Sequence, residues 1–285
     1  MGLGPDGRVR AAQQHVHDMR SQEQGATSQG ELLVAKIGGS TLGSHDTTLA
    51  DVVELKRRGM RPVVVHGGGS LISEWLDRHN VPTRFENGLR VTDEASLDVV
   101  VAVLAGVINK QIVGALSALG GRAIGISGAD GGLFTARRLD EKLGYVGEVT
   151  SVDGSVLATL WRSGFIPVIA PIALLWEGER PTAQLLNVNA DNAAGAIAAT
   201  LVSGLFFLTD VPGVRLGNGA IASRLAPDQA ESLIGSGVIE GGMIPKVQAS
   251  VAASRAGCKA VIVDGREEHA LVRVVDGEMI GTTIS

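Results

Sequence analysis

Short apolar runs alternate along the chain with longer stretches in which apolar residues recur every three or four positions. The first run, at 32–35, is Leu-Leu-Val-Ala, which is too short for an independent helix. The stretch at 47–58 has the apolar spacing of one helix face and is followed by Gly59. A second apolar run, rich in β-branched residues, lies at 62–65. Strands separated by amphipathic helices are typical of a parallel sheet with crossover helices, so the pattern predicts an α/β fold.

The same alternation continues to the end of the chain. A hairpin or loop over 82–92 is expected to present Arg90, and short antiparallel strands are expected over 134–149. The region 93–119 is a long helix with Gly106 and Gly114 as candidate breaks. The other predicted helices are 70–80, 152–163, 193–200, 227–234 and a helix ending at 256, and the other predicted strands are 122–127, 165–171, 205–208 and 260–264.

Residues 1–30 differ from the rest of the chain. They are rich in Gln, Ser, Gly and His and contain few large apolar residues, so we expect a flexible leader. The segment 8–22 lacks Gly and Pro, and an interface helix that docks on another subunit is the alternative. The folded domain is therefore predicted to span 31–285.

Composition limits the class of protein further. With 285 residues and 45% hydrophobic residues, the chain can bury the core of one large domain or of two lobes. A net charge of -5 gives no electrostatic reason to expect nucleic acid as a partner. The single cysteine, Cys258, excludes an intrachain disulfide and is expected to be an inert core residue, which fits a reducing compartment. We find no apolar run approaching the roughly 20 residues of a bilayer span, so we expect a cytoplasmic protein without a membrane partner.

Two predicted strands end in glycine turns. Lys36 and the pair Gly38-Gly39 follow the first apolar run, and His66 with Gly67-Gly68-Gly69 follows the second. Glycines at the carboxyl ends of parallel strands let the backbone approach a ligand, and Lys36 adds the positive charge that a phosphate needs. Neither turn is a Walker loop or a dinucleotide fingerprint, which weakens the case for a dinucleotide oxidoreductase. We expect His66 to fix its glycine turn.

Four strings of the sequence together resemble one enzyme family. They are His-Gly-Gly-Gly at 66–69, Asn-Gly-Leu-Arg-Val-Thr at 87–92, Asn-Val-Asn-Ala-Asp at 187–191 and Gly-Gly-Met-Ile-Pro-Lys at 241–246. Over 31–285 the chain resembles the amino acid kinase family, and within it the members that act on N-acetyl-L-glutamate. The resemblance implies a three-layer αβα sandwich around a mainly parallel central sheet. It also implies an N-terminal lobe, about 31–182, that binds the amino acid, and a C-terminal lobe, about 183–285, that binds ATP.

The resemblance also implies roles for particular residues. Lys36 and Lys246 would flank the transferred phosphoryl group, and Asp191 would hold both lysines without acting as a base, since a carboxylate nucleophile is already ionised at pH 7. Gly39 and Gly68 would donate backbone N–H groups to the phosphoryl oxygens.

Two further sets of residues would bind the substrates. The acetylglutamate would be held by Gly68, Gly69, Arg90 and Asn187, with Arg90 forming a bidentate pair with the carboxylate that does not react. The nucleotide would contact Lys36, Gly38, Gly39, Asp210, Gly213, Val238, Ile239, Glu240 and Lys246. Magnesium would be held by the phosphates of ATP, with no ligand from the protein.

Without the resemblance, several of these residues have simpler interpretations. Arg90 has Glu86 and Asp93 within reach in the sequence as surface ion-pair partners. Asn187, Asn189 and Asp191 are all suited to capping the helix that follows them. Lys246 taken alone is a solvated lysine in the first turn of a helix.

The resemblance implies ATP-dependent phosphorylation of the side-chain carboxylate of N-acetyl-L-glutamate, a step of arginine biosynthesis that yields an acyl phosphate. It further implies a homodimer, with a hexamer formed through the N-terminal segment as an alternative. Two other functions stay open: a sister kinase for another acyl amino acid of the aminoadipate type, and a non-catalytic amino-acid or nucleotide sensor with the same fold. Inhibition by arginine stays open as well.

Overall fold

The computed structural model describes residues 30–38, 47–86 and 88–285. The predicted leader and its alternative interface helix, except for Gly30, lie outside the described residues. Gly39, predicted to bind phosphate, also lies outside them.

The described part of the chain is built around an eight-stranded sheet in the order β12-β14-β13-β11-β1-β2-β8-β5. Neighbouring strands are parallel except β13 and β14, which are antiparallel. The strands are β1 Leu32–Ile37, β2 Arg61–His66, β5 Ala123–Ser127, β8 Ile166–Ala170, β11 Gly204–Thr209, β12 Arg224–Leu225, β13 Ala260–Asp264 and β14 Thr282–Ile284. Strands β1, β2, β5 and β8 come from the predicted N-terminal lobe, and β11 to β14 come from the predicted C-terminal lobe. That division into lobes stays a prediction.

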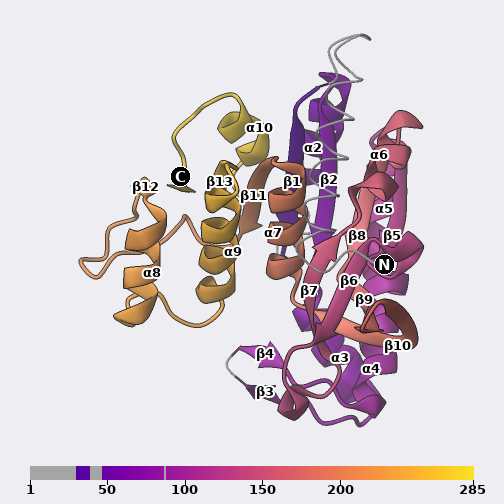
Figure 1. Ribbon diagram of the computed structural model, residues 1–285. Helices are drawn as coiled ribbons and strands as arrows, with labels where there is room; N and C mark the ends of the chain where they lie inside the picture. Colours follow the sequence, from indigo (N-terminus) through magenta and orange to yellow (C-terminus); the bar gives the residue numbers. More distant parts are fainter. Residues whose placement is uncertain (1–29, 39–46, 87) are drawn as a thin grey trace.

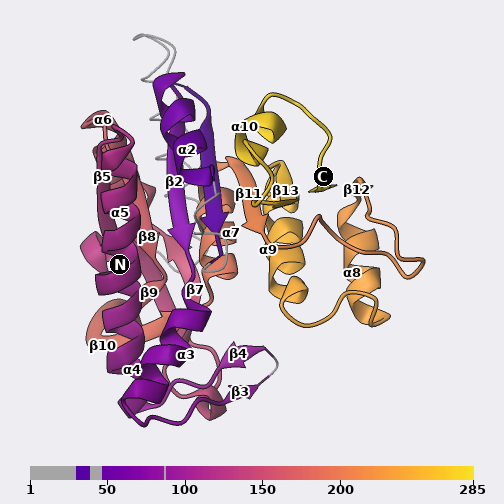
Figure 2. The ribbon, with the colours of Figure 1, turned by 180° about the vertical axis from the view of Figure 1, so that it is seen from behind.

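Helices cover both faces of this sheet, as Figures 1 and 2 show from opposite sides. The helices are α2 Thr48–Arg57, α3 Gly69–Arg78, α4 Glu94–Val101, α5 Asn109–Ala118, α6 Gly154–Arg162, α7 Ala190–Leu201, α8 Pro227–Gly235, α9 Met243–Arg255 and α10 Ala270–Val275. A π-helical segment, η1 Ala102–Ile108, joins α4 to α5, and two short 3₁₀ turns lie at η2 Asp130–Gly132 and η3 Glu141–Leu143.

Successive residues of the central strands point into two different hydrophobic cores. Val34 of β1 packs into the core shared with α6, α7 and α9, whereas Leu33 and Ala35 pack into the core shared with α2, α3, α5 and α10. The same alternation holds along β11, where Phe207 faces the first core and Phe206 the second. Because side chains of a strand alternate between faces, a strand buried on both faces is apolar at nearly every position. The predicted three-layer αβα sandwich is confirmed.

A second, smaller β structure lies beside the main sheet. Strands β6 Phe134–Arg138, β7 Val146–Val152, β9 Ile172–Glu177 and β10 Arg180–Val188 close into a four-stranded barrel. Short antiparallel strands were predicted over 134–149, but β9 and β10 were not predicted. Strand β10 runs directly to Asn189 and α7, so the barrel sets the position at which α7 begins.

The predicted long helix is continuous, with neither Gly106 nor Gly114 breaking it. Glu94–Ala118 spans 25 residues with a mean hydropathy of 2.0 and is long and apolar enough, by length and composition alone, to cross a membrane. The expectation that no stretch approaches this length was therefore wrong for this helix. One side of it is buried in the core, and its C-terminal part, α5, contacts β5 and β8 of the sheet.

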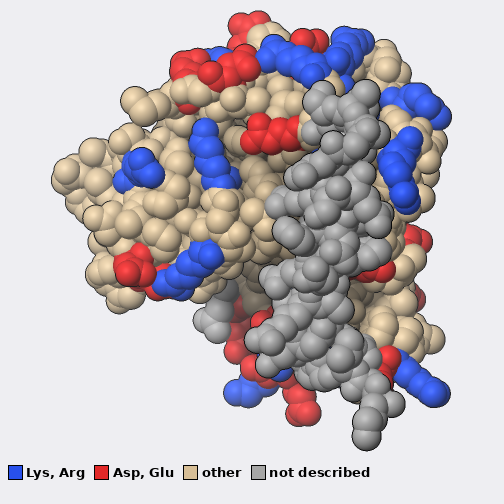
Figure 3. All heavy atoms as spheres, turned by 45° about the horizontal axis from the view of Figure 1, so that its top comes forward, with Lys and Arg blue, Asp and Glu red and all other residues tan. Residues whose placement is uncertain are grey.

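The predicted hairpin that presents Arg90 is also present. It consists of β3 Phe85–Glu86 and β4 Leu89–Arg90, which pair antiparallel. On the face of the molecule shown in Figure 3, acidic and basic side chains lie next to one another along the upper edge.

Candidate active site

Two lysines from different elements meet at one buried carboxylate. Lys36 lies at the carboxyl end of β1, and its Nζ is 2.7 Å from Asp191 Oδ1. Lys246 lies in the first turn of α9, and its Nζ is 3.0 Å from Asp191 Oδ2. Asp191 lies in the first turn of α7, where the side chain of Asn189 caps the helix by accepting hydrogen bonds from the backbone N–H groups of Asp191 and Asn192. The cap fixes the helix end from which the carboxylate projects.

The charges of this cluster are held away from solvent. Asp191 is 4% exposed and Lys36 is 7% exposed. Burial alone would raise the pKa of Asp191, but the charges and hydrogen bonds of Lys36 and Lys246 outweigh it and hold that pKa below its usual value. Asp191 is therefore ionised at neutral pH and can orient two ammonium groups, but it is poorly suited to accept a proton.

The second predicted glycine turn lies next to this cluster. Gly67 follows β2 and donates its N–H to the carbonyl of Ile37, 3.1 Å away, at the end of β1. A Cβ on Gly68 would be 2.4 Å from Ile108 Cδ1 and 2.9 Å from Leu104 Cδ2, so a side chain there would have to push these two side chains aside. Helix α3 starts at Gly69, and the first N–H groups of a helix have no acceptor within it. The turn therefore presents backbone donors beside Lys36, a suitable arrangement for an anion.

Arg90 lines the same cavity and is buried, and no carboxylate of the described residues pairs with it. Its guanidinium donates to the carbonyl of Gly69 at 3.0 Å, to Ser73 Oγ at 2.8 Å and to Thr83 Oγ1 at 3.3 Å. Among the described side chains, neither Glu86 nor Asp93 forms an ion pair with it, and Asp93 instead caps α4. Burial lowers the pKa of Arg90, but a guanidinium stays protonated in proteins. The site thus holds a cation whose charge no carboxylate neutralises.

Asn187 and Thr92 connect the hairpin to the barrel. Asn187 of β10 donates to Thr92 Oγ1 at 3.0 Å, and Thr92 Oγ1 donates to the carbonyl of Arg90 at 3.1 Å. The backbone of Thr92 also pairs with Leu143 and Tyr145 near the barrel. Asn187 therefore supports the strand that carries Arg90, and its side-chain oxygen remains for a ligand.

These groups surround one cavity of about 180 Å³. We call the part lined by Lys36 and Asp191 the lysine end and the part lined by Arg90 and Phe85 of the hairpin the arginine end. The glycine turn also lines the cavity. Apolar contacts come from Ile72 and Leu104. The remaining lining residues are Gly88, Leu89, Val146, Pro171, Asn187, Val188, Asn189 and Ala190.

The structure brings most predicted phosphoryl- and amino-acid-binding residues to this cavity. Lys36, Asp191, Gly68, Gly69, Arg90 and Asn187 line it. Lys246 reaches it through its contact with Asp191. Gly38 lies just beyond β1, where its N–H points to the carbonyl of Leu208 at 3.4 Å.

The other predicted nucleotide-binding residues do not line this cavity. Asp210 and Gly213 follow β11, and Gly213 has a φ of 146° with no room for a side chain because Thr282 Oγ1 would be 2.6 Å from a Cβ. Val238, Ile239 and Glu240 precede α9. The side chain of Ile239 is buried in the core, so only its backbone is available to a ligand.

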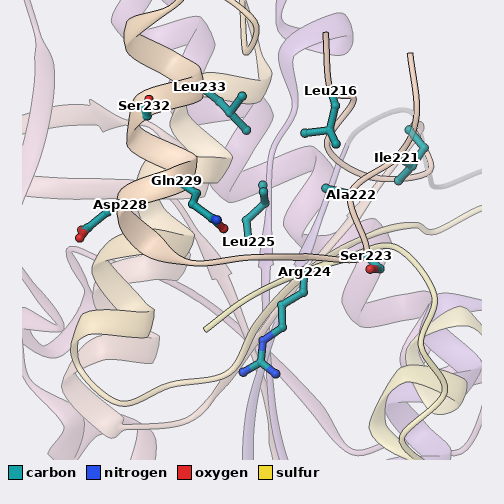
Figure 4. Close-up of a pocket in the computed structure, with 10 residues that line it drawn as sticks. All are labelled: Leu216, Ile221, Ala222, Ser223, Arg224, Leu225, Asp228, Gln229, Ser232 and Leu233. Carbon is teal, nitrogen blue, oxygen red and sulfur yellow. The ribbon is translucent and has the colours of Figure 1, made fainter. Parts of the chain in front are cut away.

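A wider groove of about 770 Å³ is lined by α8 and by residues 216 and 221–225 (Figure 4). Leu216, Leu225 and Leu233 point into the space between α8 and the loop that precedes β12, while Asp228 points away from it. The N–H groups of Val238 and Ile239 donate to the carbonyl of Leu233, and Gly217 lies close to Val238. Val238 and Ile239, which precede Lys246 in the chain, therefore lie beside Leu233 in the wall of the groove.

Sequence reasoning missed the polar residues that support the predicted ones. Ser73 and Thr83 hold Arg90, and Thr92 holds Asn187. A serine in the second turn of α3 and threonines flanking a hairpin have no distinctive spacing. Only the resemblance string that contains Thr92 gave a signal for it.

The described residues include no group of three or more His, Cys, Asp or Glu side chains able to hold a metal ion. Asp191, the carboxylate in the cavity, is engaged by two lysines.

Comparison with known proteins agrees with this geometry. The model of the amino acid kinase family matches residues 31–264. An acetylglutamate kinase of Dehalococcoides mccartyi is 42% identical over 261 residues, covering 90% of this chain and 96% of the relative. An acetylglutamate kinase of Gluconacetobacter diazotrophicus is 46% identical over 258 residues, covering 85% of this chain and 81% of the relative.

Solved structures show the same architecture. A Streptococcus mutans protein is 29% identical, with a TM-score of 0.76 over 89% of this chain and 98% of its own. A carbamate kinase of Giardia, at 14% identity, has a TM-score of 0.67 over 90% of this chain and 99% of its own, which bears on the fold alone. With a family model matching most of its length and relatives above 40% identity, the chain belongs to the amino acid kinase family.

Proposed function

We propose that this chain transfers the γ-phosphoryl group of ATP to the side-chain carboxylate of N-acetyl-L-glutamate, forming an acyl phosphate for arginine biosynthesis. The observation that carries the proposal is one cavity with a two-lysine cluster at one end and an unneutralised arginine at the other. Relatives with the name acetylglutamate kinase support the choice of acceptor.

The lysine end suits the phosphoryl group. In phosphoryl transfer an enzyme contributes chiefly positioning and electrostatic stabilisation, because little covalent chemistry is left for it to perform. It holds the attacking and leaving oxygens in line and stabilises the negative charge on the phosphoryl oxygens. Lys36 and Lys246, held by opposite oxygens of Asp191, would bind the phosphoryl oxygens from two sides. The acceptor carboxylate oxygen forms the new bond to phosphorus while the bond to the β-phosphate oxygen breaks, and ADP leaves. No proton is transferred, so Asp191 has no need to act as a base.

The arginine end suits the amino acid. Gly68 and Gly69 would donate backbone N–H groups, and Asn187 would hydrogen-bond the acetylated amine. Arg90 would pair with the α-carboxylate, exchanging neutral acceptors for a charged one. This leaves the side-chain carboxylate directed toward the lysine end.

The nucleotide would extend from the cavity toward the second groove. Asp210 and Gly213 after β11 and the backbone of Val238 to Glu240 before α9 would contact it, and the leucines of the groove suit the faces of a purine ring. Magnesium would enter with ATP, bound by its β- and γ-phosphates, and would neutralise their charge. The proposed protein contacts to the nucleotide are those of the lysines, the glycine turns and these segments.

The test is a hydroxylamine-trapping assay of acyl phosphate with ATP and N-acetyl-L-glutamate. We expect Lys36→Ala and Lys246→Ala each to lower kcat by about a hundredfold or more, the scale of a lost transition-state donor. Lys259→Ala, at an exposed lysine outside the cavity, is the matched control and should retain full activity. Normal turnover in both cavity variants would refute the mechanism.

The same assay distinguishes the sister kinase from the proposed function. N-acetyl-L-aspartate, N-acetyl-L-glutamate and N-acetyl-L-aminoadipate differ by one methylene each, and the cavity length between Arg90 and Lys36 should select one of them. Highest kcat/KM with the aminoadipate derivative would assign the chain to that sister activity. If none of the acceptors is phosphorylated while ATP still binds, the non-catalytic sensor would be the remaining interpretation.

We further propose a cytoplasmic homodimer. Its candidate interface is the outer side of the long helix, where Ala102 and Gly106 are exposed and Val99 and Val113 are half-buried. Sedimentation of the full chain measures the assembly, and removal of residues 1–30 tests the alternative hexamer.

A further inference from the structure

A buried polar network lies directly before the glycine turn, where β2 ends. Asn109 is fully buried where α5 begins, directly after the π-helical segment. His66, which is 1% exposed, lies at the end of β2 directly before Gly67. Their side chains meet at 3.2 Å, between Asn109 Nδ2 and His66 Nε2.

The acceptors around Asn109 determine which way its amide points. Its Nδ2 lies 3.0 Å from the carbonyl of Val168, which can only accept a hydrogen bond. Its Oδ1 lies 3.0 Å from the ammonium of Lys110, which can only donate one. The NH₂ group therefore faces Val168 and the ring of His66, and the opposite orientation would oppose like groups at both contacts.

This orientation selects one protonation state of His66. Because Asn109 donates to Nε2, that nitrogen must be the unprotonated one, and the ring proton lies on Nδ1. Nδ1 in turn lies 3.1 Å from the carbonyl of Gly67, to which it donates. Burial, with the charges of Lys36 and Lys110, lowers the pKa of His66 to about 4, so the ring is neutral at pH 7.

The bond to Gly67 has a geometric consequence for its neighbour. The carbonyl of Gly67 and the N–H of Gly68 belong to the same planar trans peptide unit and point in opposite directions. A carbonyl held toward His66 therefore directs the Gly68 N–H away from the ring. Gly68 lines the cavity, and Ile108 and Leu104 of the π-helical segment pack against its α-carbon.

From this arrangement we infer that Asn109 is a positioning residue of the proposed kinase reaction. It holds His66 as the Nδ1–H tautomer, and His66 aims the Gly68 N–H at the transferred phosphoryl group. The inference rests on the proposed function, in which Gly68 binds the phosphoryl oxygens. Asn109 touches no substrate and acts through His66 and the glycine turn.

The first measurement is the ¹⁵N NMR spectrum of the histidine rings in the active full-length chain. The signal of His66 is assigned by its loss in His66→Phe. We expect a protonated Nδ1 and an unprotonated Nε2 at neutral pH. A protonated Nε2 in the wild-type chain would overturn the inference, whatever the variants do.

The second measurement uses Asn109→Leu, which keeps the branched shape of the side chain and removes its polar atoms. We expect kcat to fall about tenfold to a hundredfold through loss of an aimed donor, with the KM for N-acetyl-L-glutamate within about threefold. The neutral His66 ring should then populate the Nε2–H tautomer beside the Nδ1–H tautomer. Ser117→Ala, an exposed change on the same helix, is the control and should keep both values.

A double variant separates positioning from mere support of the fold. If Asn109 acts through His66, the loss of kcat in His66→Phe/Asn109→Leu should be close to that of His66→Phe alone. Losses that multiply, or an unchanged kcat in Asn109→Leu, would overturn the inference. Absence of acyl phosphate from the wild-type chain would refute the proposed function instead. The tautomer of His66 measured by NMR would still test whether Asn109 and His66 orient the glycine turn.

Discussion

The two ends of the cavity hold their cations in different ways. At one end Lys36 and Lys246 share a buried carboxylate, at 2.7 and 3.0 Å. At the other end Arg90 is as deeply buried as Lys36, but its hydrogen-bond acceptors are a carbonyl and two hydroxyls.

This difference separates positioning from recognition. The paired lysines have their geometry fixed by Asp191 before any ligand arrives, which favours an in-line transfer that depends on placement. Arg90 has neutral acceptors that a carboxylate can replace with a stronger, charge-assisted partner. A cation left without a counter-charge thus marks the end at which a substrate carboxylate supplies it.

The largest expected effect comes from removing the shared carboxylate. Asp191→Asn removes the counter-charge shared by the buried Lys36 and the partly buried Lys246, and we expect a loss of about 3 kcal/mol in the free energy of unfolding. Because the pKa of Asp191 is lowered, its contribution is present above the usual carboxyl range and is lost only as the pH falls through the lowered pKa. Urea unfolding from pH 7 to pH 3 should show a constant deficit that shrinks at the acidic end.

The exposed carboxylate of Asp228, paired with Arg255, is the control for that experiment. Asp228→Asn should change the free energy of unfolding by less than about 1 kcal/mol, as exposed ion pairs generally do. Equal losses of unfolding free energy in Asp191→Asn and Asp228→Asn would show that the buried cluster stabilises the fold no more than a surface ion pair does.

A smaller effect is expected at the recognition end. Arg90→Lys keeps the charge but loses the planar fork, so we expect the KM for N-acetyl-L-glutamate to rise about tenfold, the scale of one charged hydrogen bond. The kcat should change little, because this end does not touch the transferred group. Initial rates over both substrates measure this, and a collapse of kcat at unchanged KM would place Arg90 with the lysines instead.

The smallest effect is expected at the pair of His269 and Asp51, because the histidine side chain is far more exposed than Lys36 or Arg90. His269 Nδ1 lies 2.6 Å from Asp51, which raises the pKa of the half-exposed His269 ring. Its contribution to stability is therefore full below the usual histidine pKa and is lost as the pH rises through the raised value. His269→Asn, which tolerates the left-handed backbone there, should lower Tm by roughly a degree or two at pH 6 and less at pH 8.5. A larger deficit at pH 8.5 would reverse this assignment.

Much of the fold could be predicted because its strands are short, apolar and bounded by glycines. The doubly buried β1, β2, β8, β11 and β13 all overlap the predicted runs, with ends that differ by at most two residues. Strands β9 and β10 were missed because their segment mixes apolar residues with Trp176, Glu177 and Arg180 in no clear period. Their pairing into a barrel depends on contacts between distant parts of the chain, which local pattern does not encode.

The site was predicted unevenly for a similar reason. Lys36 and the glycine turns follow from local pattern, whereas the meeting of Lys36, Asp191 and Lys246 needed the family resemblance. Asn109 gave no signal, because one asparagine in an apolar helix looks like a solvent-facing position. Its importance appears only when β2, β5 and β8 are placed around it.

Gly125 on β5 makes that placement possible. A Cβ there would lie 1.8 Å from Asn109 Oδ1, so the asparagine side chain occupies the volume that any larger residue at 125 would need. The two positions, 16 residues apart, are therefore sterically coupled: a side chain at 125 requires that Asn109 move or be replaced. In variants of this chain, residues 109 and 125 therefore have to be changed together.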